Sequence, residues 1–129
     1  RKISYLHWNR NSGRKLGMPT TGNAGGVHNL TLEANAGNLA DLCRQMGQGL
    51  LVTELIGFGI NGVTGDYSRG AAGFWVEGGE IQYPVEEITI AGNLPDMFRG
   101  FVAAGSDVDT RGNLRAGSIL IDRMTVAGE

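Results

Sequence analysis

Cysteine, excess charge of one sign and long apolar runs are scarce in this chain, and each scarcity excludes a class of protein. The single cysteine, Cys43, excludes an internal disulfide and suits a reducing compartment. The 11 basic and 13 acidic residues nearly balance, which argues against a nucleic-acid-binding surface. No apolar run approaches the roughly 20 residues that span a bilayer, and no signal peptide is recognised. We therefore expect a cytoplasmic protein with no direct contact to nucleic acid or membrane.

Histidine is equally scarce, and this bears on metal binding. The two histidines, His7 and His28, are far apart, and neither has a glutamate at the helical spacing of a zinc protease. Cys43 falls among Leu39, Leu42 and Met46 at helical spacing, where a buried thiol that packs like a small apolar side chain is favoured over a ligand. We expect no zinc site in this chain.

The length of 129 residues is typical of one domain, and we expect residues 1–129 to form a single domain. The chain opens with Arg1 and Lys2 instead of methionine, so we expect a fragment of a longer protein. Its 22 glycines are dispersed without a period, which excludes collagen and simple repeats and indicates many tight turns. A turn-rich antiparallel sheet explains them better than a peptide-binding backbone does.

The clearest local signal is a hairpin. Residues 74–77 are aromatic and β-branched, Gly78 and Gly79 suit the positive φ angles of a tight turn, and residues 80–85 return. Pro84 cannot donate a ladder hydrogen bond, so the returning strand either leaves the sheet there or lies at its edge. A further short strand is predicted at residues 88–90.

Other elements follow from periodicity and capping residues. Asn38 predicts the start of a helix that ends at Gly47, and Pro95 predicts a second helix with Met97, Phe98, Phe101 and Val102 buried, ending at Gly105. The remaining predictions are loops at 14–26 and 111–117 and strands at 27–33, 50–56 and 118–126, the last with a bulge near Asp122. The fold class is α+β, predominantly antiparallel sheet with two short packed helices and glycine-rich loops.

One glycine motif suggests a nucleotide site and is rejected. Residues 57–62 read GFGING and satisfy GxGxxG directly after an apolar strand. The dinucleotide fingerprint needs a helix next, and residues 63–73 contain Gly65, Gly70 and Gly73 without an amphipathic pattern. We interpret the motif as a glycine-rich connection.

Several separated segments, taken together, resemble one family. They read RKLGMPTTGNAGG from Arg14, GDYSRGAAGFWVE from Gly65, then IQYP, EITIAGNL and a closing MTVAG. In this order they are similar to the C-terminal domain of the PmbA/TldD family, in its PmbA (TldE, "modulator of DNA gyrase") branch. The resemblance covers residues 13–128, whereas residues 1–12 match poorly.

The resemblance implies a two-subunit cytoplasmic protease. A TldD-like partner carries zinc on an HExxxH helix, completed by a cysteine in a CGK-type insertion, and the PmbA-like chain lacks this site. Here residues 111–117 are short and contain no cysteine. The resemblance also implies an N-terminal domain upstream. No cofactor is expected in this chain, and zinc is expected on the partner.

Four polar residues before the hairpin, Asp66, Tyr67, Ser68 and Arg69, are the candidates for a substrate groove or a partner contact. The alternative is a turn held by a local Asp66–Arg69 pair, since aspartate and serine favour turns. Ser68 lies in GDYSRG, which is not the GxSxG elbow, so a serine hydrolase is disfavoured although His28 is available.

The resulting hypothesis is the zinc-free half of a heteromeric metalloprotease. Its partners would be the TldD-like subunit and unfolded peptides, held extended by strand addition to an open sheet edge. Peptide-antibiotic precursors and antitoxins are the substrate classes that the resemblance implies. Self-association stays open. The alternative is a non-enzymatic scaffold or regulator that acts on a partner such as gyrase.

Overall fold

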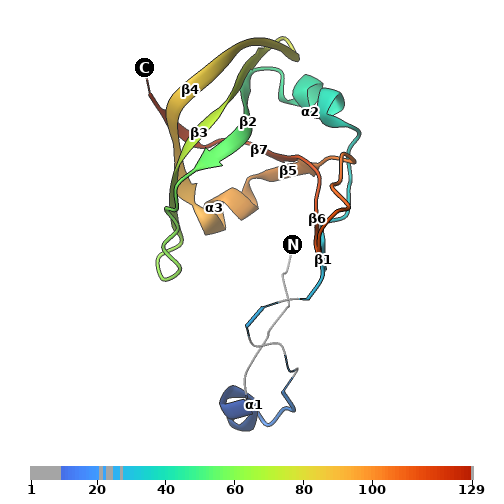
Figure 1. The fold of residues 1–129 in the computed structure, drawn as a ribbon, viewed down its shortest axis with the longest axis vertical. Coiled ribbons are helices and arrows are strands. Elements are labelled where there is room, and N and C mark those ends of the chain that lie inside the picture. The colour runs from blue at the N-terminus through green and yellow to red at the C-terminus, as the bar shows by residue number, and fades with distance from the viewer. Residues whose placement is uncertain (1–9, 21, 23–24, 27, 129) are drawn as a thin grey trace. The chain divides into compact units, whose positions relative to one another are not determined.

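The computed structural model describes residues 10–20, 22, 25–26 and 28–128 and divides the chain into two compact units (Figure 1). Unit 1 comprises Arg1–Thr31 and Asp109–Arg115, and unit 2 comprises Leu32–Val108 and Ala116–Glu129. His7 and the rest of residues 1–9 lie outside the described residues. Among those described, no helix has both the length and the apolar character needed to cross a bilayer.

The described residues of unit 1 form one helix and one pair of very short strands. Helix α1 (Arg10–Leu16) carries Arg14 and Lys15 in its last turn, where cations favour the negative end of the helix dipole. Gly17 follows with φ +66°. The loop predicted for 14–26 therefore begins only after Leu16. Strand β1 (Leu30–Thr31) pairs in parallel with β6 (Leu114–Arg115), so the strand predicted for 27–33 is shorter than expected, and Val27 lies outside the described residues.

Unit 2 is built on a four-stranded antiparallel sheet in the order β2-β3-β4-β8. Its strands are β2 (Gly49–Ile56), β3 (Asp66–Glu77), β4 (Glu80–Asn93) and β8 (Thr125–Ala127). A second, two-stranded sheet pairs β5 (Phe101–Ala104) with β7 (Ile119–Ile121). With helices α1, α2 (Leu39–Met46) and α3 (Leu94–Arg99), this confirms the predicted α+β class. The described residues form three short helices, where two were predicted.

The β3–β4 hairpin is confirmed at the residues that predicted it. Glu77 pairs with Glu80, and Gly78 and Gly79 have φ angles of +61° and +77°, which both central residues of a type I′ turn require. The strand predicted at 88–90 is the continuation of β4 after a bulge, where Glu87 takes φ +54°. Pro84 stays in the sheet, opposite Phe74, at an edge because β8 pairs only with residues 89–91.

Helix α2 begins and ends as its sequence predicts. Asn38 accepts a hydrogen bond from the Asp41 N–H at 3.0 Å, and the Asp41 carboxylate accepts one from the Asn38 N–H at 3.0 Å. This reciprocal capping box satisfies two N–H groups that the helix itself leaves unpaired. At the other end, the Gly47 N–H donates to the Cys43 carbonyl at 3.0 Å with φ +72°. Leu42 and Cys43 are buried, so Cys43 packs as an apolar side chain.

Two predicted elements are wrong. The second helix stops at Arg99, where Gly100 donates to the Asp96 carbonyl at 2.8 Å, and residues 101–104 form strand β5. Phe98 is therefore 64% exposed instead of buried. The last strand, predicted for 118–126, is divided between β7 and β8, which belong to different sheets. Asp122 lies at this division and donates its N–H to the Gly100 carbonyl at 2.8 Å.

The core of the larger sheet is small. Ala71, Ile88 and Ile90 form its buried centre, and five partly buried side chains pack against it: Leu50, Val52, Tyr67, Val85 and Met124. The centre lies where β3 and β4 pair, so the strand that begins with residues 66–69 also contributes to the core.

Candidate functional site

The four candidate residues open strand β3, and the loop that precedes them folds back onto them. This loop, residues 57–65, connects β2 to β3 and is called the 57–65 loop below. The Ser68 N–H donates to the Gly59 carbonyl at 2.7 Å, the Asn61 N–H donates to the Asp66 carbonyl at 2.8 Å, and Ile60 forms a bridge with Tyr67. The loop is thus held along the strand by backbone hydrogen bonds.

Asp66 holds the C-terminal end of the loop by hydrogen bonds. Its carboxylate accepts from the Thr64 hydroxyl at 2.9 Å and from the Asn93 side-chain amide at 3.4 Å. The same amide donates to the Thr64 carbonyl at 3.1 Å, and the Asn61 side chain accepts from the N–H groups of Val63 and Thr64. Asp66 therefore joins the loop to the end of β4, where Asn93 lies.

Arg69 holds the N-terminal end of the loop. Its Nε donates to the Gly57 carbonyl at 3.0 Å, across the start of the loop. The alternative of a turn clamped by Asp66 and Arg69 is wrong in both respects. Residues 66–69 are extended, and the two side chains bind opposite ends of the loop instead of each other. Ser68 lies within the same strand, so it does not occupy the strand-to-helix elbow of a hydrolase nucleophile.

This network presents two apolar side chains to solvent. Phe58 is 86% exposed and Val63 is 96% exposed, and both belong to the 57–65 loop. Large apolar side chains on a well-fastened loop are typical of contact surfaces, because holding them in place costs little further entropy on binding. Neither residue was among the candidates predicted from the sequence. Their signal was the presence of apolar side chains between glycines, outside any strand or helix periodicity.

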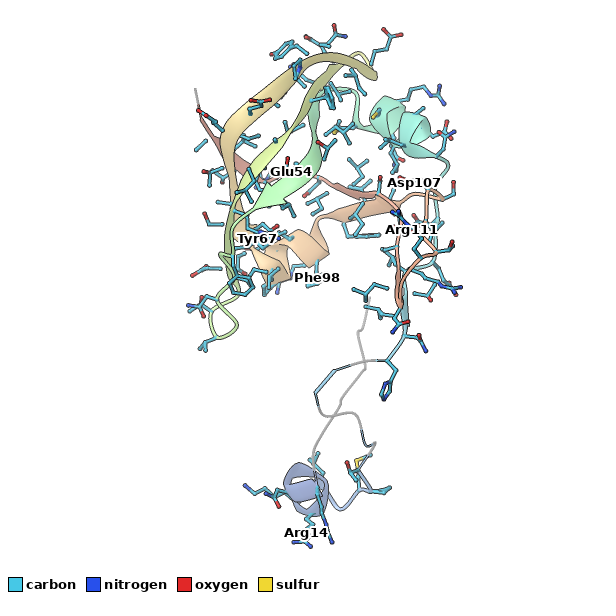
Figure 2. All side chains as sticks on the ribbon, viewed as in Figure 1. Arg14, Glu54, Tyr67, Phe98, Asp107 and Arg111 are labelled. Atoms are coloured by element: carbon cyan, nitrogen blue, oxygen red, sulfur yellow. The ribbon has the colours of Figure 1, made fainter. Side chains whose placement is uncertain are left out.

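Tyr67 lies at a second feature, a hollow of about 630 Å³ inside unit 2. Strand β2, helix α2 and strand β7 contribute most of the lining, and Tyr67 and Trp75 of β3 add to it. Figure 2 shows Tyr67 on β3 and Glu54 on β2, which lines the same hollow. We call it the β2–β7 groove.

No described group of residues suits a metal ion. Within the described part of the chain, no three histidine, cysteine, aspartate or glutamate side chains come together. Cys43 is buried in α2, and His28 is exposed in unit 1. The donors that a zinc ion needs, three or four nitrogen, sulfur or oxygen ligands at one point, are not gathered by these residues. The residues described here do not fit the zinc site of a metallopeptidase.

The sequence relationship is decided by a family match over almost the whole chain. A model of the PmbA/TldA metallopeptidase C-terminal domain matches residues 3–128. The chain belongs to the PmbA/TldD family. The match also includes residues 3–12, upstream of residue 13, where the resemblance read from the motifs begins.

Relatives with assigned names agree with this family. The chain is 56% identical over 118 residues to metalloprotease PmbA of Escherichia coli O157:H7 and covers 26% of that protein. It is 59% identical over 118 residues to a metalloprotease PmbA homolog of Haemophilus influenzae, again covering 26%. Each alignment takes in more than nine-tenths of this chain. The chain thus spans about a quarter of the length of these relatives.

Solved structures share the fold. One from Thermotoga maritima, described as a proposed modulator of a DNA gyrase, matches 92% of this chain with a TM-score of 0.83 and 38% identity. Another from Bacteroides thetaiotaomicron, described in the same terms, matches 91% with a TM-score of 0.81 and 32% identity. The chain covers 29% and 26% of these two structures, respectively.

Proposed function

We propose that the chain is the C-terminal domain of the zinc-free subunit of a heteromeric metalloprotease that cleaves unfolded peptides. The identity of 56–59% to chains named metalloprotease PmbA carries the proposal. The absence of a donor cluster among the described residues supports placing the zinc on a TldD-like partner. A zinc ion there would supply an activated water for peptide hydrolysis. Flexible chains such as peptide-antibiotic precursors and antitoxins are the substrate class.

The 57–65 loop is our candidate for the contact with this partner. Phe58 and Val63 offer an apolar tip. The loop is fixed before binding by hydrogen bonds that Asp66 accepts and that Ser68 and Arg69 donate. Aromatic side chains in such positions contribute a large share of interface free energy. The roles of the four candidate residues therefore divide, with Asp66, Ser68 and Arg69 positioning the loop and Tyr67 lining the groove.

The division of labour is tested with the full-length protein and a TldD-like subunit, each purified alone and then mixed. We expect elemental analysis to find zinc with the TldD-like subunit only. Cleavage of an unfolded peptide should need both subunits. One tightly held zinc per chain in the full-length protein alone, lost on substitution of Cys43 or His28, would overturn the assignment.

The partner contact is tested separately by Phe58→Ser, with Phe98→Ser as the matched control. Phe98 is also exposed but lies on α3, outside the loop. Loss of one well-placed aromatic contact of at least about 1.4 kcal/mol weakens binding about tenfold. We expect this loss for Phe58→Ser and not for Phe98→Ser, measured by titration of one subunit with the other. Equal affinities would remove the loop from the interface.

A second candidate function is regulation of DNA gyrase, because the two solved relatives are described as proposed gyrase modulators. The near balance of acidic and basic residues favours a protein target over DNA. Purified gyrase incubated with the full-length protein should then change its supercoiling rate in the absence of any zinc subunit. An unchanged rate would leave the protease subunit as the function.

A further inference from the structure

The β2–β7 groove lies between two strands that each have a free edge. Strand β2 is the terminal strand of the four-stranded sheet, and β7 pairs on one side only, with β5. Figure 1 shows β7 running past β2 within unit 2, and residues of both strands line the same hollow. Each free edge presents backbone N–H and C=O groups that an added strand could pair.

The pattern of the lining shows that edges face the groove. Residues 49–55 of β2 all line it without a break, and so do residues 118–124, which include β7. Alternate residues of a strand point to opposite faces, so a sheet face would contribute only every second residue. An unbroken run indicates that the strand edge borders the hollow. The groove therefore offers backbone hydrogen-bonding groups along both β2 and β7.

The lining is mostly apolar, with Gln48, Thr53 and Ser118 as its uncharged polar residues. Only Glu54, Asp122 and Arg123 among the lining residues carry a charge, and helix α2 contributes Leu39, Leu42 and Met46. Leu55 of β2 and Ile119 of β7 are exposed there. At the same time, the fully buried apolar side chains of the described residues are few and mostly small. An open apolar hollow beside so small a core is a surface that a stable protein covers.

We propose that, in the full-length protein, an extended and largely apolar strand from the polypeptide outside residues 1–129 lies in this groove and pairs with both β2 and β7. Two free strand edges beside one hollow select an extended backbone, and the mostly apolar lining selects apolar side chains. The rest of the polypeptide can supply this strand, because this chain covers only about a quarter of the length of its relatives. A strand of the same polypeptide covers the groove permanently, whereas a peptide substrate would leave it open between turnovers. The strand would join the two sheets of unit 2 into one.

Residue-resolved amide exchange of the full-length protein tests this, without a partner subunit or added peptide. The free edge of a strand leaves alternate amides unpaired, so a filled groove is recognised by protection of consecutive amides in β2 (Gly49–Ile56) and β7 (Ile119–Ile121). We expect these amides to exchange at least about a hundredfold more slowly than free ones. The protection should be the same at low and high protein concentration.

Each other outcome overturns the proposal. Alternate protection would mean an empty groove. Protection that rises with protein concentration would assign the groove to a second copy. Protection that appears only with an added unfolded peptide would make the groove the substrate site, where the peptide adds as a strand to an open sheet edge.

Two matched variants of the full-length protein give an independent readout. Ile119→Lys places a charge in the groove, and Ile81→Lys places one on β4 outside its lining; the two isoleucines are 50% and 52% exposed in this chain. We expect the urea midpoint to fall for Ile119→Lys alone, since only Ile119 would be covered. Equal midpoints would overturn the proposal. Neither measurement involves proteolysis, so failure here leaves the proposed protease role untouched.

Discussion

Gly59 lies where the 57–65 loop touches strand β3, and replacing it with alanine tests how the loop is held. A Cβ atom at Gly59 would lie 1.7 Å from the Ser68 carbonyl oxygen and 2.9 Å from the Ser68 carbonyl carbon. These are backbone atoms of a paired strand, so neither can rotate away. The loop itself must therefore move off the strand.

The cost follows from the contacts that this movement breaks. The hydrogen bonds from Ser68 to Gly59 and from Asn61 to Asp66, at 2.7 and 2.8 Å, would both be lost. At roughly 1 kcal/mol for each, Gly59→Ala should lower the free energy of unfolding by about 2 kcal/mol. Urea unfolding measures this loss. Faster amide exchange at Asn61 and Ser68 would show that the lost stability comes from the contacts between the loop and β3.

Gly62→Ala is the matched control. A Cβ at Gly62 meets nothing within 4 Å, and its φ is not in the left-handed region. An exposed substitution of this kind should stay within about 0.5 kcal/mol of the unmodified protein. Equal stabilities of the two variants would refute the geometry of the loop. If Gly59→Ala is destabilised and still binds a TldD-like subunit with full affinity, the loop does not form the interface.

Two further predictions concern charged groups. Arg69→Ala should lower the free energy of unfolding by about 1 kcal/mol or less, because an exposed hydrogen bond to the Gly57 carbonyl is lost. The variant should stay folded, as circular dichroism would show. It should also bind the TldD-like subunit more weakly, which titration measures. The hydroxyl of Ser118, followed by its N–H, lowers the pKa of Asp107 from 3.8. Asp107 therefore stabilises the fold above about pH 4, and this contribution is lost as the pH falls through its lowered pKa. The urea midpoint of Asp107→Asn should lie below that of the unmodified protein at pH 7, and the difference should shrink as the pH falls below about 4. A difference that does not change with pH would contradict the linkage.

The elements that sequence analysis predicted correctly are those whose determinants lie within a few residues. Gly78 and Gly79 supply two positive φ angles in succession, which leaves the β3–β4 turn few alternatives. Asn38 and Asp41 cap α2 through reciprocal hydrogen bonds only three residues apart. Such signals do not depend on the rest of the fold. The family resemblance rests on the same strand-and-turn segments.

The elements predicted wrongly depend on partners distant in sequence. The apolar residues 101–104 continue the spacing of a helix, yet they pair with β7 as strand β5. The periodicity of a short apolar run is compatible with a helix or a strand, so the presence of a strand edge to pair with determines which one forms. The division of 118–126 has the same origin, since β7 pairs with β5 and β8 pairs with β4. Neither pairing can be read from the run itself.

The candidate site shows the same limit at the level of single side chains. Asp66 and Arg69 lie three residues apart, which made a local ion pair the natural interpretation. In an extended strand, side chains separated by an odd number of positions point to opposite faces, so these two cannot meet once residues 66–69 join β3. Each instead binds the loop that precedes it, Asp66 through Thr64 and Arg69 through Gly57. Residues 66–69 stay a proposed site, within which Asp66 and Arg69 hold the loop that carries the exposed side chains of Phe58 and Val63.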